Sequence, residues 1–251
     1  MNRYFIELAY MGTGFSGFQI QENAPTIQLE LQRAMETIFR TPFELTGSSR
    51  TDAGVHAYQN YFHFDTDQEL NTARVYNINA LLPPSIVVKS LVLMHSEAHC
   101  RFDAVSRWYQ YTVCREKDPF MQDRSYYYPY ALDLIRLNEA AALLSTYQDF
   151  TSFSKRNSQV KTHICTIKRS FWEERGNCLV FNIEANRFLR GMVRGLTGTQ
   201  LQVGRGKLGL EEFRGVIEAK DATEADFAVP GHGLSLCAVR FPEGYFDKRG
   251  G

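Results

Sequence analysis

The 251-residue sequence lacks the run of roughly 18 apolar residues that a membrane-spanning helix needs, so such a span is excluded. It has no Cys-x-x-Cys pair, and its five cysteines are scattered, so neither a disulfide framework nor a zinc ribbon is expected. Glu7 interrupts the first apolar run, so the N-terminal residues do not form a signal-peptide pattern. These absences predict a protein of the reducing cytoplasm with no metal site.

The chain has no excess charge overall, because 28 Lys and Arg balance 28 Asp and Glu. The charges are unevenly spread, however, since residues 155–214 contain twelve basic and five acidic side chains. Such a segment is able to hold a polyanion on one face. A solvated surface with uneven charge explains the same counts, and composition alone leaves both interpretations open.

Hydrophobic spacing predicts a β-α-β-β-α-β order in both halves of the chain, with one helix inserted before the last strand of the second half. In the first half we expect strands at 3–10, 43–46, 58–64 and 86–94, with helices at 26–39 and 72–82. In the second half we expect strands at 108–114, 163–172, 178–185 and 234–241, with helices at 133–146, 187–203 and 210–219. This order predicts an α+β protein of two ferredoxin-like β-α-β-β-α-β halves with mainly antiparallel sheets.

The expected domains are residues 1–103 and 104–251, joined near residues 101–106 with no low-complexity linker between them. Two short motifs do not fit a cofactor site. Residues 12–17 match Gly-x-Gly-x-x-Gly, but the sequence that follows is a poor helix former, so we expect a flexible loop rather than a dinucleotide site. His95, His99 and Cys100 lack a second ligand pair and are interpreted as loop residues.

The most informative segment is 47–57, Gly-Ser-Ser-Arg-Thr-Asp-Ala-Gly-Val-His-Ala, which lies between two expected strands. Loops of small residues that carry an acid are common sites of chemistry. A carboxylate beside a cation stays ionised and acts as a nucleophile or base, which makes Asp52 next to Arg50 a candidate. A structural Arg–Asp pair that pins a turn is the alternative, and both interpretations stay open.

Segment 47–57 resembles the signature of the tRNA pseudouridine synthase A family. Further blocks of resemblance lie at 10–19, 79–83, 101–104, 107–111, 149–153, 188–194 and 230–236, so nearly the whole chain is covered. Three residues depart from the usual pattern: Met11 stands where Asp is usual, Phe18 where Trp is common, and Ser49 where Gly is usual. None of these changes removes a reactive group.

The resemblance implies the pseudouridine synthase fold and the isomerisation of uridine to pseudouridine at positions 38, 39 and 40 of the tRNA anticodon stem-loop. The C1′–N1 bond breaks, the retained uracil turns, and a C1′–C5 bond forms, so no cofactor is required. The resemblance also implies a homodimer. The tRNA would be the partner, and its target base must be flipped out of the stem.

The resemblance assigns roles to individual residues. Asp52 is the essential carboxylate, Arg194 its ion-pair partner, and Tyr109 the aromatic platform whose hydroxyl helps with the proton. Arg50 displaces the flipped base. The expected helix at 187–203 would place three arginines on one face, Arg187, Arg190 and Arg194. Candidate phosphate contacts are Lys155 and Arg156, together with Lys161, Lys168 and Arg169.

Two other functions compete with this assignment. A glycoside hydrolase would pair Asp52 with a second carboxylate, and Asp65 and Asp67 are the only acids close in sequence. A non-catalytic RNA-binding module would not need the carboxylate of Asp52. His56 is able to contact RNA or to cap the loop, and we favour the structural role.

Overall fold

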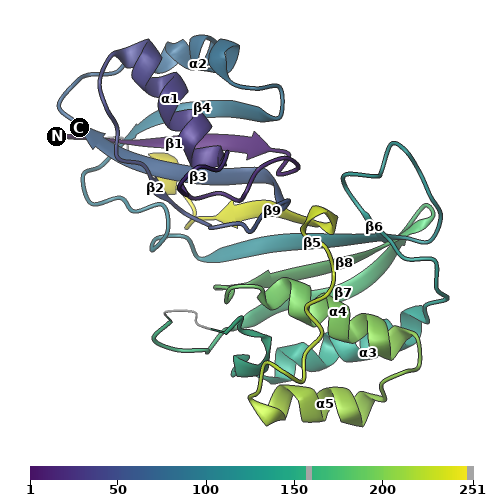
Figure 1. The fold of residues 1–251 in the computed structure, drawn as a ribbon. Coiled ribbons are helices and arrows are strands. Elements are labelled where there is room, and N and C mark those ends of the chain that lie inside the picture. The colour runs from purple at the N-terminus through teal and green to yellow at the C-terminus, as the bar shows by residue number, and fades with distance from the viewer. Residues whose placement is uncertain (157–159, 248–251) are drawn as a thin grey trace. The chain divides into compact units, whose positions relative to one another are not determined.

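The computed structural model describes residues 1–156 and 160–247 and divides them into two compact units (Figure 1). Unit 1 comprises Met1–Val105 and the chain from Leu236 onward, and unit 2 comprises Ser106–Ser235. The first boundary lies in the expected junction. The second differs from expectation, because the chain after Ser235 belongs to unit 1 rather than to the second domain.

Unit 1 is an antiparallel sheet with two helices on one face (Figure 1). Its central strand β1 (Asn2–Tyr10) pairs with β3 (His56–Thr66) on one side and with β4 (Ile86–Met94) on the other. The short strand β2 (Thr46–Gly47) pairs with β3, and β9 (Leu234–Arg240) lies next to β3 in the same sheet. The helices are α1 (Ile27–Phe39) and α2 (Val75–Leu81).

Helix α1 shows why the sequence folds locally as expected. The Thr26 side chain caps the helix by accepting the N–H of Leu29 at 3.3 Å. Ile27, Leu31 and Met35 follow at helical spacing and are buried. An apolar stripe of this kind anchors the helix to the sheet by removing side chains from water.

The other face of the unit 1 sheet is covered by the C-terminal segment. The ring centroids of Phe241, Tyr245 and Phe246 lie 6.1, 6.1 and 6.2 Å from that of Phe5. Phe241 also meets Tyr61 edge-on at 5.3 Å. These aromatic contacts explain why the chain after β9 belongs to unit 1.

Unit 2 is also a sheet with its helices on one face (Figure 1). Strand β8 (Cys178–Ala185) lies between β5 (Ser106–Cys114) and β7 (Ile167–Arg175), antiparallel to both, while β6 (Tyr126–Tyr127) is parallel to β5. The helices are α3 (Leu134–Leu143), α4 (Met192–Gly204) and α5 (Leu210–Ala219).

The α+β class with mainly antiparallel pairing is confirmed, with five α-helices among the described residues. The finer prediction of two ferredoxin-like halves stays a prediction. No helix within 1–156 and 160–247 is long and apolar enough to cross a membrane.

Several expected elements have the wrong boundaries. The strand expected at 163–172 is shifted to Ile167–Arg175, the bounds of β7. Helix α4 begins at Met192 rather than at residue 187, because Gly191 has φ 76°, outside the helical region. The strand expected at 43–46 is reduced to Thr46–Gly47. Phe43 is nevertheless buried, with its ring packed edge-on against Phe64 at 5.0 Å.

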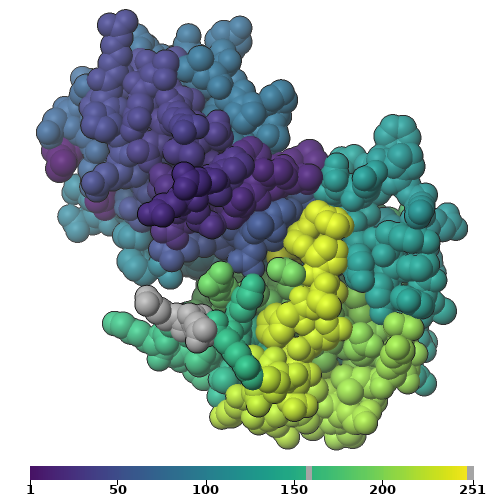
Figure 2. Space-filling view, viewed as in Figure 1, coloured from purple at the N-terminus to yellow at the C-terminus, as the bar shows by residue number. Residues whose placement is uncertain are grey.

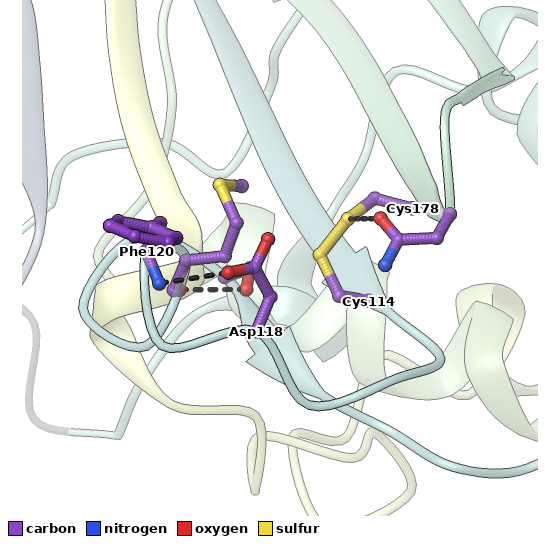
Figure 3. The surroundings of a disulfide bond; sticks show 7 residues. Cys114, Asp118, Phe120 and Cys178 are labelled. Carbon is purple, nitrogen blue, oxygen red and sulfur yellow. Dashed lines mark hydrogen bonds between the residues drawn. A yellow bond between two sulfur atoms is a disulfide. The ribbon is translucent and has the colours of Figure 1, made fainter.

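One cysteine pair departs from the expectation of unlinked thiols. Cys114 at the end of β5 and Cys178 at the start of β8 are register partners and form a disulfide (Figure 3). Beside it lies a turn in which the Asp118 carboxylate accepts the N–H of Phe120 at 2.8 Å. The two cysteines are 64 residues apart, so no local pattern indicates the bond.

Candidate active site

The candidate catalytic loop, residues 48–55, connects β2 to β3 in unit 1, as the sequence predicted. The Ser48 N–H donates to the Tyr61 carbonyl at 2.8 Å, and the Val55 N–H donates to the Asp52 carbonyl at 3.2 Å. Asp52 is half-buried and Arg50 is exposed. The second contact closes a turn directly after Asp52, so its backbone position is defined.

A buried hydrogen-bond network holds the residues on both sides of Arg50. The side-chain amide of Asn60 donates to the Ser49 carbonyl at 2.8 Å and to the Tyr10 hydroxyl at 3.1 Å. The Tyr10 hydroxyl also lies 2.8 Å from Oγ1 of Thr51. Burial raises the pKa of Tyr10 to about 12, so the phenol is neutral at physiological pH. The network therefore fixes the backbone immediately before Asp52.

The Gly-rich segment after β1 packs onto the same loop. The Gly12 N–H donates to Nδ1 of His56 at 3.0 Å, and the Phe18 N–H donates to the Thr51 carbonyl at 3.1 Å. A Cβ atom at Gly12 would collide with the Val55 carbonyl group. The segment is thus a packed support rather than the flexible loop expected, and its hydrogen bond to His56 supports the structural role favoured for that residue, which stays a prediction.

Two hydroxyl groups of the loop stand out. Ser48 and Ser49 are only 5 and 8% exposed, and neither Oγ atom has a hydrogen-bond partner among the described residues. The Ser49 N–H donates to Oδ1 of Asn60 at 3.3 Å. The backbone of Ser49, rather than its hydroxyl, therefore holds the loop at the position where the family usually has Gly.

Arg194 lies in the first turn of α4 in unit 2, half-buried. Its Nε donates to the Val229 carbonyl at 2.8 Å, and its Nη2 donates to the Phe227 carbonyl at 3.4 Å. The next carbonyl, that of Pro230, accepts the Tyr111 hydroxyl at 2.7 Å. Burial raises the pKa of Tyr111, against the opposing charge of Arg194. The guanidinium is thus held by the segment that follows α5.

Tyr109 lies on β5 of unit 2 and is 8% exposed. Its ring meets that of Phe188 edge-on, with centroids 5.1 Å apart. This contact connects β5 to the turn that precedes α4. An aromatic side chain fixed in this way suits a stacking platform, the role that the resemblance implies.

Several of the other predicted binding residues lie in or next to the same turn. Arg187 is half-buried and Arg190 is exposed, and both precede α4, so the expected arginine face of one helix is wrong. The Arg190 carbonyl accepts the Lys155 N–H at 2.9 Å. Arg156 is exposed, with Nη2 3.9 Å from Oδ1 of Asp221. The turn rather than a helix therefore collects the basic residues.

The predicted residues divide between the two units. Asp52 and Arg50 belong to unit 1, and the remainder belong to unit 2. Arg187 and Arg190 lie in the turn 186–191, Tyr109 and Lys155 contact it, and Arg194 follows it in α4. Arg156 is the neighbour of Lys155, and the other predicted phosphate contacts, Lys161, Lys168 and Arg169, are exposed elsewhere in unit 2. The ion pair between Asp52 and Arg194 stays a prediction. Within the described parts of the chain, no group of three or more His, Cys, Asp or Glu side chains is placed to hold a metal.

Comparison with known proteins decides the family. A family model described as tRNA pseudouridine synthase matches residues 140–242. The tRNA pseudouridine synthase A of Parabacteroides distasonis is 47% identical over 248 residues, covering 98% of each chain. The enzyme of the same name from Bacteroides thetaiotaomicron is 46% identical over 99% of this chain and 94% of its own length. The Staphylococcus aureus enzyme of that name is 34% identical over 96% and 92%.

The chain belongs to the tRNA pseudouridine synthase A family. The family model covers the unit 2 turn and Arg194, whereas Asp52 lies outside the residues that it matches. Asp52 falls within the span of the relatives that align with nearly the whole chain, such as that of Parabacteroides distasonis.

In this member of the tRNA pseudouridine synthase A family, the structure shows residues that hold the candidate site in place and that the sequence did not indicate. Tyr10 and Asn60 hold the candidate catalytic loop through their side-chain hydrogen bonds, but the sequence indicates only that each belongs to an expected strand. Phe188 holds Tyr109 and reads as part of a helix face. The available signal was Asn60 itself, because a polar residue among alternating aromatics of a strand requires a buried partner.

Proposed function

We propose that this chain isomerises uridine to pseudouridine at positions 38, 39 and 40 of the tRNA anticodon stem-loop, with Asp52 as the essential carboxylate. One observation carries the proposal. Relatives that align with nearly the whole chain at 46 and 47% identity are tRNA pseudouridine synthases A. The stem-loop positions and the role of Asp52 come from the resemblance of segment 47–57.

The chemistry requires the target uridine to leave the stem, because a paired base offers no access to its glycosidic bond. Asp52 then acts in its ionised form, either by attack on C1′ or by removal of the 2′ proton. Both routes release N1 of the uracil and rejoin C1′ to C5. The defined turn after Asp52 supports this role because catalysis depends on a fixed carboxylate position.

The unit 2 residues supply the remaining roles. Arg194 keeps Asp52 ionised by contributing a nearby positive charge, and Tyr109 stacks against the flipped uracil. Arg50 occupies the space that the base leaves. Phosphate groups of the stem-loop contact the basic residues around the turn, Lys155, Arg156, Arg187 and Arg190.

A glycoside hydrolase is disfavoured by the position of Asp65. Its carboxylate accepts two hydrogen bonds from Arg3, at 2.8 and 2.6 Å, and the contact with Arg3 lowers its pKa. A general acid must instead hold a proton near neutral pH. Asp65 also lies near the far end of β3, about 30 Å along the strand from His56. Paired glycosidase carboxylates lie within about 10 Å of each other.

The test is Asp52→Asn, which removes the charge and keeps the shape of the side chain. Tritium release from tRNA carrying 5-tritiated uridine measures the reaction, because C5 loses its hydrogen when it bonds to C1′. We expect no release above background, with tRNA binding retained. Asp67→Asn is the matched control, since Asp67 is an exposed carboxylate beyond β3, and it should react at the wild-type rate.

Full tritium release by Asp52→Asn would end the catalytic assignment of this residue. Retained binding without any release by the wild-type protein would favour the non-catalytic RNA-binding module. Free uracil as a product would favour the hydrolase.

We also propose that the enzyme is a homodimer, as its resemblance implies, and that it works in the cytoplasm, as the scattered cysteines indicate. Light scattering of the purified protein measures the dimer. Because cytoplasmic thiols are kept reduced, we expect Cys114 and Cys178 to be adjacent thiols there. Alkylation of freshly lysed cells followed by mass spectrometry distinguishes the thiols from the disulfide.

A further inference from the structure

We propose that a basic pocket of unit 2 binds a phosphate group of the tRNA backbone, with Lys220 as a contact that the sequence did not indicate. The proposal rests on the proposed function, because it concerns how the same substrate is held. The pocket has a volume of about 260 Å³, and its lining includes Lys155, Arg156, His163, Lys220 and Asp221. Thr151 and Ser154 also line the pocket, and the Thr151 hydroxyl donates to Oδ1 of Asp149 at 2.6 Å.

The charges of the pocket suit an anion. Lys155, Arg156 and Lys220 face one lining carboxylate, that of Asp221. This carboxylate accepts the Thr223 N–H at 2.9 Å, and the contacts with Thr223 lower its pKa. Its hydrogen-bonding capacity is thus partly used by its own turn. Three cations around one pocket form the chemistry that recognises a phosphate group.

Lys220 has a backbone conformation that is uncommon for a lysine. The residue directly after α5 has φ 53° and ψ 30°, the left-handed conformation in which helices usually place Gly. A lysine is less favourable there than Gly, and Arg40 has the same conformation after α1, so the conformation sets the direction of the side chain but does not by itself indicate a ligand. Its ammonium lies 2.9 Å from Oδ2 of Asp149, but the two side chains are 62 and 31% exposed. Such solvated ion pairs contribute little stability, so a phosphate group would compete with Asp149 for the ammonium at little cost.

The pocket is continuous with the proposed RNA-binding residues. The Lys155 N–H donates to the Arg190 carbonyl, so the pocket wall adjoins the turn before α4. Figure 2 shows the segment after α5, coloured yellow, on the surface of unit 2, and Asp221 and Ala222 at its start line the pocket together with Lys155. A phosphate held here would lie on the same basic surface as one held by Arg190.

The experiment compares Lys220→Gly with the matched control Arg40→Gly. Arg40 has φ 57° and ψ 36° directly after α1, so each variant removes one exposed cation and one left-handed side chain. Arg40 belongs to unit 1 and does not line the pocket. Both variants should therefore change thermal stability similarly.

We expect Lys220→Gly alone to raise the KM for tRNA about fivefold, with the effect on KM rather than on kcat. The slope of log(kcat/KM) against log salt should become shallower by about one unit, as for one lost phosphate contact. Arg40→Gly should retain the wild-type KM and slope.

Equal KM values for the two variants would overturn the proposal while leaving the proposed function intact. Inorganic phosphate tests whether the pocket binds free phosphate rather than a phosphate group of the tRNA backbone. If phosphate raises the melting temperature of the wild type but not of Lys220→Gly, and KM for tRNA is unchanged, the pocket binds free phosphate and the tRNA assignment is wrong. Failure of the wild type to form pseudouridine would instead overturn the proposed function, and tRNA binding by filter retention would still test Lys220.

Discussion

Removal of one hydroxyl group, by Tyr10→Phe, tests whether the buried network holds the catalytic loop. Phe keeps the ring but loses the contacts with Thr51 and Asn60 at 2.8 and 3.1 Å. Each bond contributes about 1 kcal/mol, and Oγ1 of Thr51 is left buried without that partner. We therefore expect a loss of about 2 kcal/mol in the free energy of unfolding at pH 8. Because the lost contact holds Thr51, the residue before Asp52, kcat should fall by about tenfold or more.

The pH dependence of the free energy of unfolding provides a second, independent test of this prediction. The pKa of Tyr10 is raised from 10.0 to about 12 by burial, so the folded protein keeps its phenol proton at a pH where the unfolded chain loses it. Stability from this group is complete below pH 10 and is lost as the pH rises towards 12. At pH 11 the wild type has lost about 1.4 kcal/mol through Tyr10, whereas Tyr10→Phe has no such loss.

Urea unfolding at pH 8 and pH 11, with tritium release at pH 8, measures both effects. Other tyrosines titrate in both proteins and cancel in the difference. The deficit of Tyr10→Phe should therefore shrink from about 2 to below about 1 kcal/mol between the two pH values. Tyr58→Phe is the control, because Tyr58 is 59% exposed on β3. An equal deficit at both pH values, or an unchanged kcat, would refute the reasoning.

Two further substitutions test the supports of the site. Gly12→Ala should lower stability by about 1–3 kcal/mol and slow tritium release, because the added methyl group displaces the Val55 backbone. Gly215→Ala, with open space around its Cβ position, should leave the rate unchanged, and an equal effect of both would contradict the account. Arg194→Ala should lower kcat by about a hundredfold by removing the cation proposed to pair with Asp52. A wild-type kcat for that variant would show that the ion pair is not needed.

Much of the fold follows from local sequence patterns. Thr26 followed by buried residues at helical spacing predicted α1, and alternating aromatics predicted β3. The expected start of α4 was wrong because Phe188 and Leu189 continue the apolar spacing across Gly191. Hydrophobic periodicity does not reveal a single residue in the left-handed conformation, and here that residue, Gly191, separates a turn from a helix.

Contacts between distant segments were beyond the sequence pattern. Phe241 and Tyr245 pack against Phe5, more than two hundred residues earlier in the chain, so the C-terminal segment belongs to unit 1. The bond between Cys114 and Cys178 arises in the same way, from strand pairing across 64 residues. Local propensity carries no information about which strands become neighbours.

The candidate site depends on which residues of β1 and β3 are paired with each other. Tyr10 reaches the catalytic loop because the register of β1 and β3 shifts between Leu8, paired with Asn60, and Tyr10, paired with Ala57. A bulge of this kind changes the direction of the side chains that follow it. Without the shift, strict alternation would pair Tyr10 one residue further along β3. The sequence therefore identifies Asp52 as a candidate catalytic residue in a loop. The irregular register, which no periodic pattern specifies, positions the Tyr10 hydroxyl that holds that loop.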